Sequence, residues 1–499
     1  MSQLSDTVVR FSLNGLVAGP GRFRLHGHRP ARFKQMHELQ NRQVLVMGLG
    51  GHGRAACRLL QRCGAKVVAV ESADTEVLRT EAGSLRALGI RVELGAVMPP
   101  RQHFDLAVVS PAVVESAPLF QEMARRNVPV IGELELGYQQ ANCLAVAIAG
   151  TNGKSTTAGL VERLLAQNHR KTVVCGHQAR PLCAAVEQSN DLDFLILQAS
   201  PFQLELTQHF RPAVAVLLNL APDHLNRYAT EADYVRANAR LFANQQAFDW
   251  AIVQREALLQ LQSLDLPLPG KVISFSAQDR KADIFMDRGL LVSRMAEWAG
   301  PLLDMDKCQL RGLYNAENLM AALAVGHVLR VPLEAMAEAA QSYVQGPHRG
   351  ELVAEIGGVK YINDSKATNV DALRNALLAT PVQRRGEPNI WLIAGGQDKK
   401  LDFRDVGRLL SQRVKGALLL GQAREKMRAA WSLFTPCTLV HSLLEAVSAA
   451  ATHATPGDVV LLSPACSSFD QFRNYQRRGE VFCQAVRSIG GGDRAAHPN

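Results

Sequence analysis

Long hydrophobic runs are missing from this 499-residue chain. No apolar stretch approaches the roughly 18 residues that a membrane-spanning helix requires, so we expect no transmembrane segment. The nine cysteines are scattered and odd in number, and no two of them form a C-x-x-C pair. This pattern argues against a disulfide framework and against a zinc site, and it predicts reduced thiols in a cytoplasmic protein.

Acidic residues are almost absent from the first forty positions, where Asp6 and Glu38 are the only two. The segment 21–35 instead carries five basic side chains, namely Arg22, Arg24, Arg29, Arg32 and Lys34. A transit peptide, or an arm that binds nucleic acid or acidic lipid, has this kind of composition. We favour a disordered extension over residues 1–40, and we expect no nucleic-acid partner because the remainder of the chain is only mildly basic.

Apolar strands and amphipathic helices alternate through the rest of the chain. Such alternation predicts an α/β fold with mainly parallel sheets and with sites at the carboxyl ends of the strands. At roughly 150 residues per domain, the length predicts three domains. We expect a Rossmann-like domain over 41–141, a phosphate-loop ATPase domain over 142–345, a Rossmann-like domain over 346–488 and a tail over 489–499. The predicted strands include 104–111, 128–137, 193–200, 213–224, 389–396 and 458–466.

The first domain begins with a strand, a glycine turn and a helix over 42–72. Gly48, Gly50 and Gly53 form the pattern G-x-G-x-x-G, and Glu71 ends the next predicted strand. Glycines at such a turn let a diphosphate approach the helix N-terminus, and the carboxylate can accept hydrogen bonds from a ribose or a base. Alone, this pattern predicts a nicotinamide-dependent dehydrogenase, and a turn that binds nothing stays open as well.

A second glycine loop, "GTNGKST", lies between a strand and a helix at 150–156. Backbone N–H groups and the Lys154 ammonium would hold the β- and γ-phosphates of ATP, and the Ser155 hydroxyl would bind Mg²⁺. The general phosphate-loop pattern has another glycine at the position of Ile148, so this loop is a variant form.

This loop resembles the ATP-binding loop of the Mur ligase family, the enzymes that build the peptide stem of peptidoglycan. The resemblance extends over residues 42–486 and is closest to the branch that adds glutamate to UDP-N-acetylmuramoyl-L-alanine. The other segments that carry it are "ASPFQLE" (199–205), "NLAPDHLNRY" (219–228), "YNAENLMAAL" (314–323), "PHRGE" (347–351), "NDSKATN" (363–369) and "LLSPACSSFDQFRNYQRRG" (461–479).

The resemblance implies that ATP phosphorylates the acceptor carboxylate and that the amine of glutamate, favoured in its D form, displaces the phosphate. It implies a UDP-sugar site at Gly48, Gly50, Gly53, Glu71 and Ser110. The ATP site would comprise Gly150, Thr151, Asn152, Gly153, Lys154, Ser155 and Thr156, with Asn315 at the adenine, Arg349 at the phosphates and Asp364 at the ribose. Glutamate would bind to Lys366, Thr368, Lys399, Ser468, Phe469 and Tyr475. Lys154, His224 and Lys366 would be catalytic, and Ser155, His224 and Gln198 would be the metal-site residues.

Two positions at the implied metal site differ from the family. Gln198 stands where the family has a glutamate that binds a second metal, and Asn238 where it has a lysine that becomes carbamylated. We predict a weakened second metal site, with Asp223 as one candidate replacement ligand. The segments 110–112 and 175–181, on the muramoyl side, also depart from the family pattern.

These observations together predict a monomeric, cytoplasmic, ATP- and Mg²⁺-dependent ligase whose substrates are UDP-N-acetylmuramoyl-L-alanine and glutamate. Two alternatives stay open. One is a non-catalytic Mur-like protein that binds nucleotide or cell-wall precursor, and the other is the dehydrogenase that the first glycine motif alone predicts.

Overall fold

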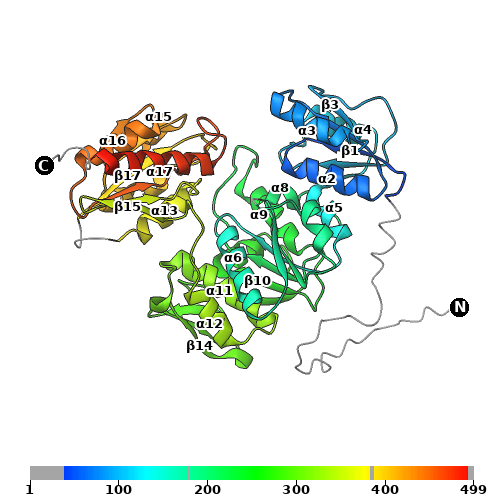
Figure 1. The fold of residues 1–499 in the computed structure, drawn as a ribbon. Helices are drawn as coiled ribbons and strands as arrows, with labels where there is room; N and C mark the ends of the chain where they lie inside the picture. Colours follow the sequence, from blue (N-terminus) through cyan, green and yellow to red (C-terminus); the bar gives the residue numbers. More distant parts are fainter. Residues whose placement is uncertain (1–38, 178, 382–386, 493–499) are drawn as a thin grey trace.

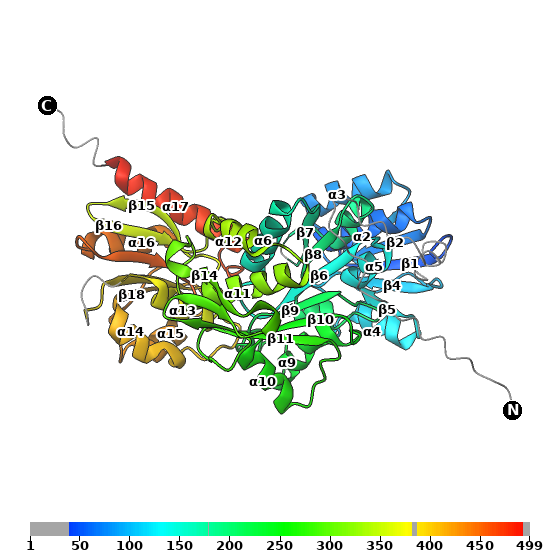
Figure 2. The ribbon, with the colours of Figure 1, turned by 90° about the horizontal axis from the view of Figure 1, so that it is seen from below.

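The structure, a computed structural model, describes residues 39–177, 179–381 and 387–492. It contains three α/β units, and the first and third lie on opposite sides of the central one (Figure 1; Figure 2, seen from below). The α/β class with three mainly parallel sheets is thereby confirmed. The predicted N-terminal extension lies outside the described residues up to position 38, and the predicted tail does so from position 493.

The first sheet is parallel throughout, in the order β3-β2-β1-β4-β5. Its strands are β1 (Gln43–Met47), β2 (Lys66–Glu71), β3 (Arg91–Leu94), β4 (Leu106–Val109) and β5 (Val130–Gly132). Helices α2 (Gly51–Arg62), α3 (Glu76–Arg86) and α4 (Pro118–Arg125) connect them. The predicted strand 128–137 is wrong in its second half, where α5 (Glu133–Gln140) begins. Two glutamates in its first turn favour this helix, because carboxylates stabilise a helix N-terminus.

The central sheet has the order β14-β13-β12-β11-β10-β9-β6-β8-β7. Strands β7 to β12 and β6 pair in parallel, and β13 and β14 add an antiparallel edge. The strands are β6 (Leu144–Ala149), β7 (Thr172–Gly176), β8 (Phe194–Gln198), β9 (Val214–Leu217), β10 (Trp250–Gln254), β11 (Lys271–Ser276), β12 (Ile284–Asp287), β13 (Leu290–Ser293) and β14 (Gly300–Asp304).

Helices cover both faces of the central sheet. On one face, α6 (Lys154–Gln167) and α11 (Leu313–Val328) form a single apolar core with the sheet, which buries nearly the whole circumference of α11. This packing presents the N-termini of α6 and α11 to the carboxyl edge of the strands. The remaining helices are α7 (Leu182–Ala185), α8 (Pro201–Leu204), α9 (Glu231–Ala239), α10 (Arg255–Ser263) and α12 (Leu333–Gln341).

The third sheet has the order β15-β16-β20-β17-β18-β19 and is parallel except for the β15–β16 hairpin. Its strands are β15 (Glu351–Ile356), β16 (Val359–Asn363), β17 (Ile390–Gly395), β18 (Val414–Leu420), β19 (Cys437–Leu439) and β20 (Val459–Leu462). One face packs on α13 (Val370–Ala379), α14 (Gly407–Arg413) and α15 (Arg424–Trp431), and the other on α16 (Leu443–His453) and α17 (Tyr475–Gly492).

The described part of the chain contains no helix that is long and apolar enough to cross a bilayer. All nine cysteines carry free thiols in the structure. We keep the domain limits given above as a proposal, since they are drawn from sequence alone.

Candidate functional site

A cleft of about 2410 Å³ lies where the three units meet. All three units contribute to its lining, which includes Gly50 and Ser110 from the first, Lys154 and His224 from the second, and Lys366 and Ser468 from the third. The geometry agrees with the rule that parallel sheets place their sites at the carboxyl ends of strands.

The phosphate loop connects β6 to α6 in the centre of this cleft. Its glycines have positive φ angles, 125° at Gly150 and 90° at Gly153. A Cβ at Gly153 would lie only 2.3 Å from the Oδ1 of Asn318, so the tight approach of α11 also requires glycine. The first turn of α6 holds no acidic residue, and its free N–H groups favour an anion.

Lys154 opens α6 and folds back over the loop. Its Nζ donates to the carbonyl oxygens of Gly150 and Thr151. Desolvation lowers the pKa of Lys154 to about 8, and Lys399 adds to this effect while Asp223 opposes it. A bound anion such as a phosphate would therefore stabilise the protonated form of Lys154.

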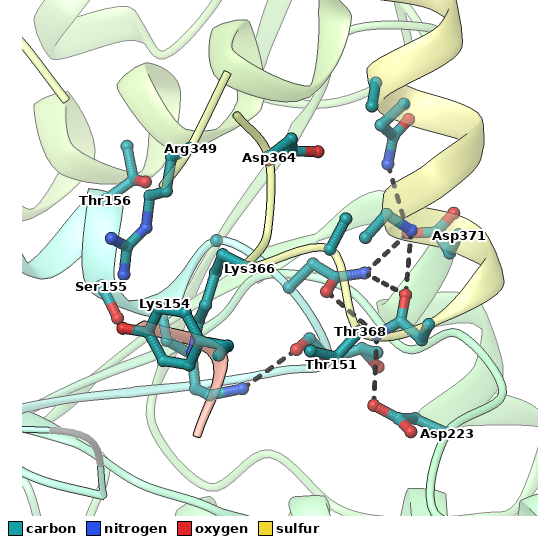
Figure 3. A pocket seen from close by; sticks show the side chains of 18 of the residues that line it. Thr151, Lys154, Ser155, Thr156, Asp223, Arg349, Asp364, Lys366, Thr368 and Asp371 are labelled. Atoms are coloured by element: carbon teal, nitrogen blue, oxygen red, sulfur yellow. Dashed lines mark hydrogen bonds between the residues drawn. The ribbon is translucent and has the colours of Figure 1, made fainter. Parts of the chain in front are cut away.

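Three further cations surround this position. Figure 3 shows Arg349 and Lys366 beside Lys154 and Ser155. Burial holds the pKa of Lys366 well below its ordinary value, and the positive charges of Arg349, Lys154 and Lys399 contribute. Positive charges held this close together repel one another unless an anion neutralises them. The cluster therefore indicates a polyanionic ligand.

Asp223 and His224 follow β9 and face the same space. Lys399 donates to Asp223 Oδ1 at 2.9 Å and Asn369 donates to Oδ2 at 3.1 Å. Burial would raise the pKa of Asp223, but Lys399, His224 and Asn369 hold it at about 2. Both oxygens thus bind residues of the third unit, and the role of Asp223 as a replacement metal ligand stays a prediction.

His224 occupies a strained backbone position with a φ angle of 57°. Its ring packs edge-on against Phe202 with the ring centroids 4.7 Å apart. Burial lowers the pKa of His224 to about 4, although Asp223 opposes the shift. The imidazole is therefore neutral at pH 7.

Ser155 and Gln198 are the residues best placed for a metal ion. The Ser155 hydroxyl donates to Gln198 Oε1 at 2.8 Å, at the carboxyl end of β8. Both oxygens are hard, neutral donors, which suits Mg²⁺ when phosphate oxygens and water complete its shell. Within the described ranges no group of three or more His, Cys, Asp and Glu side chains could hold a metal.

Asn238, on α9, is fully buried. Its Nδ2 donates to the carbonyl of Tyr234 at 2.9 Å, and its Oδ1 has no hydrogen-bond partner. The side chain is neutral and turned into the structure, and it does not line the cleft.

The predicted adenine and ribose residues lie on two different units. Asn315, on α11, accepts from Gln345 Nε2 at 3.0 Å and lines the cleft. Asp364, after β16, accepts from the Gly350 N–H at 3.3 Å and from the Ser463 hydroxyl at 3.2 Å. Burial raises the pKa of Asp364 to about 7.

The residues predicted to bind glutamate all line one end of the cleft. The Lys366 ammonium lies 4.2 Å from the centroid of the Tyr475 ring. Ser468 is buried and Phe469 beside it is 67% exposed. The others are Thr368 and Lys399.

The first glycine turn is only partly in the cleft. Gly50 and Ser110 line it, whereas Gly48, Gly53 and Glu71 do not. A Cβ at Gly53 would lie 1.8 Å from the Gly48 carbonyl oxygen, so this glycine lets the helix approach the strand. Glu71 accepts from the Leu49 N–H at 2.7 Å and thereby braces the turn.

Sequence reasoning missed four residues that shape the site. Asn369 and Asp371 lie at the start of α13 and contact the phosphate loop, and Arg478 is buried and donates to carbonyl oxygens of Ser365, Cys466 and Ser467. His52, on α2, lines the cleft and pairs with the buried Glu133 at 2.9 Å. The N-cap pattern before α13 was visible in the sequence, but its contact with another unit was not.

Two protein-family models match the chain. The Mur ligase middle domain matches residues 148–326, and the Mur ligase glutamate ligase domain matches residues 348–466. The UDP-N-acetylmuramoylalanine–D-glutamate ligase of Acidobacterium capsulatum is 39% identical over 90% of this chain and 97% of its own length. The enzyme of the same name from Pelotomaculum thermopropionicum is 36% identical over 91% of this chain and 99% of its own length.

An experimental structure with the same fold is the UDP-N-acetylmuramate–alanine ligase of Thermotoga maritima. It superimposes with a TM-score of 0.58 at 17% identity, over 90% of this chain and 100% of that one. The likeness supports the three-unit fold and nothing finer.

Proposed function

The chain belongs to the Mur ligase family, and on that premise we propose that it is an ADP-forming ligase that joins D-glutamate to UDP-N-acetylmuramoyl-L-alanine. The observation that carries the proposal is the cleft, in which a phosphate loop from the central unit faces a cationic end of the third unit. The dehydrogenase alternative loses its support, because the curated relatives that match nearly the whole chain are ligases.

The first step brings together two anions, the acceptor carboxylate and the γ-phosphate of ATP. Lys154 and the N-terminus of α6 hold the phosphates, and Arg349 adds charge from the third unit. These preorganised cations offset the repulsion and stabilise the charge that develops as the phosphoryl group is transferred. Ser155 and Gln198 would hold one Mg²⁺, which when bound neutralises further phosphate charge.

The second step is the attack of the glutamate amine on the acyl phosphate. Lys366, Thr368 and Ser468 would bind the carboxylates of glutamate through charge-assisted hydrogen bonds. Lys399 has three N–H donors, so it can serve Asp223 and glutamate together. The neutral His224 would donate a hydrogen bond to the acyl phosphate. Closure of the third unit on the central one excludes water that would otherwise hydrolyse this intermediate.

ATP and a UDP-linked precursor are cytoplasmic metabolites, so we place the reaction in the cytoplasm. We also propose a monomer, because one chain supplies residues to every part of the cleft.

The test is release of phosphate by purified protein with ATP and Mg²⁺, scanned over UDP-muramoyl acceptors and amino acids. We expect release only when UDP-N-acetylmuramoyl-L-alanine and D-glutamate are both present. Lys366→Ala should raise the KM for glutamate, and Lys360→Ala, which removes an exposed lysine of the same unit, should not. Equal turnover with lysine or diaminopimelate would refute the glutamate assignment. Nucleotide binding without turnover for any acceptor would favour the non-catalytic alternative.

A further inference from the structure

Asn369 links the third unit to two separate segments of the central unit. It is 1% exposed and forms the N-cap of α13, where its Oδ1 accepts from the Ala372 N–H at 2.9 Å. The same side chain reaches the phosphate loop: its Nδ2 donates to Asn152 Oδ1 at 3.1 Å, and its Oδ1 accepts from Asn152 Nδ2 at 3.2 Å. Its Nδ2 also donates to Asp223 Oδ2 at 3.1 Å.

These contacts use every hydrogen-bonding position of the Asn369 amide. An amide carries two N–H donors and two acceptor sites, and here two bonds are donated and two are accepted. The orientation of the amide is thereby determined, because the Ala372 N–H requires an oxygen and the ionised Asp223 requires a donor. An aspartate at this position would place one carboxylate against another.

The two partners of Asn369, Asn152 and Asp223, each lie close in sequence to a residue that we assign to the reaction. Asn152 belongs to the loop that precedes Lys154, and its Nδ2 also donates to Asp371 Oδ2 at 2.9 Å. Asp223 precedes His224 and pairs with Lys399 of the third unit at 2.9 Å. A single side chain therefore touches both the phosphate loop and the segment that carries the histidine.

We propose that Asn369 is a positioning residue that couples docking of the third unit to the geometry of the site, because its amide clamps Asn152 and Asp223 at the same time. This inference rests on the ligase function proposed above. When α13 docks, the clamp places the phosphate loop, His224 and the glutamate-binding residues in one arrangement. When the clamp is absent, each half retains its own ligands but the acyl phosphate and the amine are not aligned.

Three substitutions separate this role from helix capping. Asn369→Ser and Asn369→Asp keep a good N-cap but remove the amide donors, whereas Asn369→Ala removes both. We expect all three to lower kcat by about 50-fold, since misplacement near 1 Å can cost ~100-fold. The KM for the UDP-linked acceptor should change by less than about threefold, because its predicted site lies on the first unit. Asn369→Ser should leave the Tm nearly unchanged. Asn369→Ala should lower it through the lost N-cap, and Asn369→Asp should lower it because a second carboxylate would be buried against Asp223.

The matched control is Ser442→Ala, at the N-cap of α16 in the same unit. Ser442 accepts from the Glu445 N–H at 3.2 Å, is exposed and does not line the cleft, so we expect near-normal kcat. Normal kcat in Asn369→Ser or Asn369→Asp would overturn the proposal.

A second measurement tests the contacts of Asn369 without requiring turnover. Hydrogen–deuterium exchange of residues 150–156 should rise in Asn369→Ser and stay unchanged in Ser442→Ala, with ADP and Mg²⁺ present in both. Unchanged exchange in Asn369→Ser would overturn the clamp even if the ligase is active. If the wild-type protein shows no ligation, the proposed function fails, while the exchange data still decide the clamp.

Discussion

Two strand–turn–helix units in this molecule have the same order of elements and differ in the residues that surround the turn. One is the turn at Gly48–Gly53 in the first sheet, and the other is the phosphate loop at Gly150–Gly153 in the central sheet. The first turn has one glycine with a positive φ angle, Gly48, and the second has two, Gly150 and Gly153. Both follow a buried parallel strand, and both open helices without an acid in the first turn. Each therefore presents free N–H groups to an anion.

The difference lies in the side chains around the two turns. The first turn is completed from within its own sheet, where Glu71 accepts from the Leu49 N–H. The second turn carries a lysine and a serine, and Asn369 and Asp371 of another unit bind to it. The two turns thus share one arrangement of strand, turn and helix, and only the second combines it with an added cation and with contacts from the third unit.

The comparison predicts that a substitution in the phosphate loop causes the largest loss of kcat/KM. Lys154→Ala removes the cation nearest the phosphates, and we expect kcat/KM to fall by about 100- to 1000-fold, which corresponds to ~3–4 kcal/mol of transition-state stabilisation. Phosphate release under saturating acceptor measures the effect. Lys171→Ala, at an exposed lysine of the same unit, is the control. Near-normal amide formation by Lys154→Ala would show that the loop does not bind the reacting phosphates.

A smaller effect, on the affinity for the UDP-linked acceptor, is expected from a substitution at the first turn. Glu71→Ala removes the carboxylate that braces the turn, and we expect the KM for the UDP-linked acceptor to rise about tenfold, since a lost charge-assisted hydrogen bond costs ~1.5 kcal/mol. The KM for ATP should remain unchanged. Glu76→Ala, at an exposed glutamate on α3, provides the comparison. An equal rise in both KM values would mean that the two turns are not separate in function.

The pH dependence should reveal the lysine that only the second turn possesses. The free enzyme holds Lys154 at a pKa of about 8, and only the protonated form attracts phosphate, so binding must weaken as the pH rises. We expect kcat/KM for ATP to fall about fivefold between pH 8 and pH 9. A pH–rate profile from 6.5 to 9.5 tests this sign. A flat profile would show that the loop does not depend on this ammonium group.

The smallest effect on turnover is expected at Asn238. Asn238→Ala removes a neutral, buried amide that does not line the cleft, so turnover should change by less than about threefold despite a stability cost of ~1 kcal/mol. An amide cannot react with CO₂ as an amine does, so added bicarbonate should have no effect. Phosphate release with and without bicarbonate is the measurement. Stimulation by bicarbonate would place a carbamate elsewhere in the site and would contradict this interpretation.

Local patterns in the sequence predicted the strands and the phosphate loop well. The strand–turn–helix of 42–72, the buried strands at 193–200 and 458–466, and the placement of Lys154 at a helix start all have counterparts in the structure. The error at 128–137 has a local cause: an apolar strand runs directly into "ELELG", in which alternating leucines imitate a strand. The two carboxylates are in fact buried and hydrogen-bonded, Glu133 to the Cys183 N–H and Glu135 to the N–H groups of residues 208–210.

The sequence alone determined the α/β class and the strand–turn–helix form of each glycine loop, because hydrophobic period and glycine spacing act over a few residues. Only the tertiary structure decided that Asp223 pairs with Lys399 and that Asn369 clamps the phosphate loop. These partners are 176 and 217 residues apart along the chain. Nothing local specifies such a contact, since it depends on how the three units pack and on which buried polar groups remain to satisfy one another.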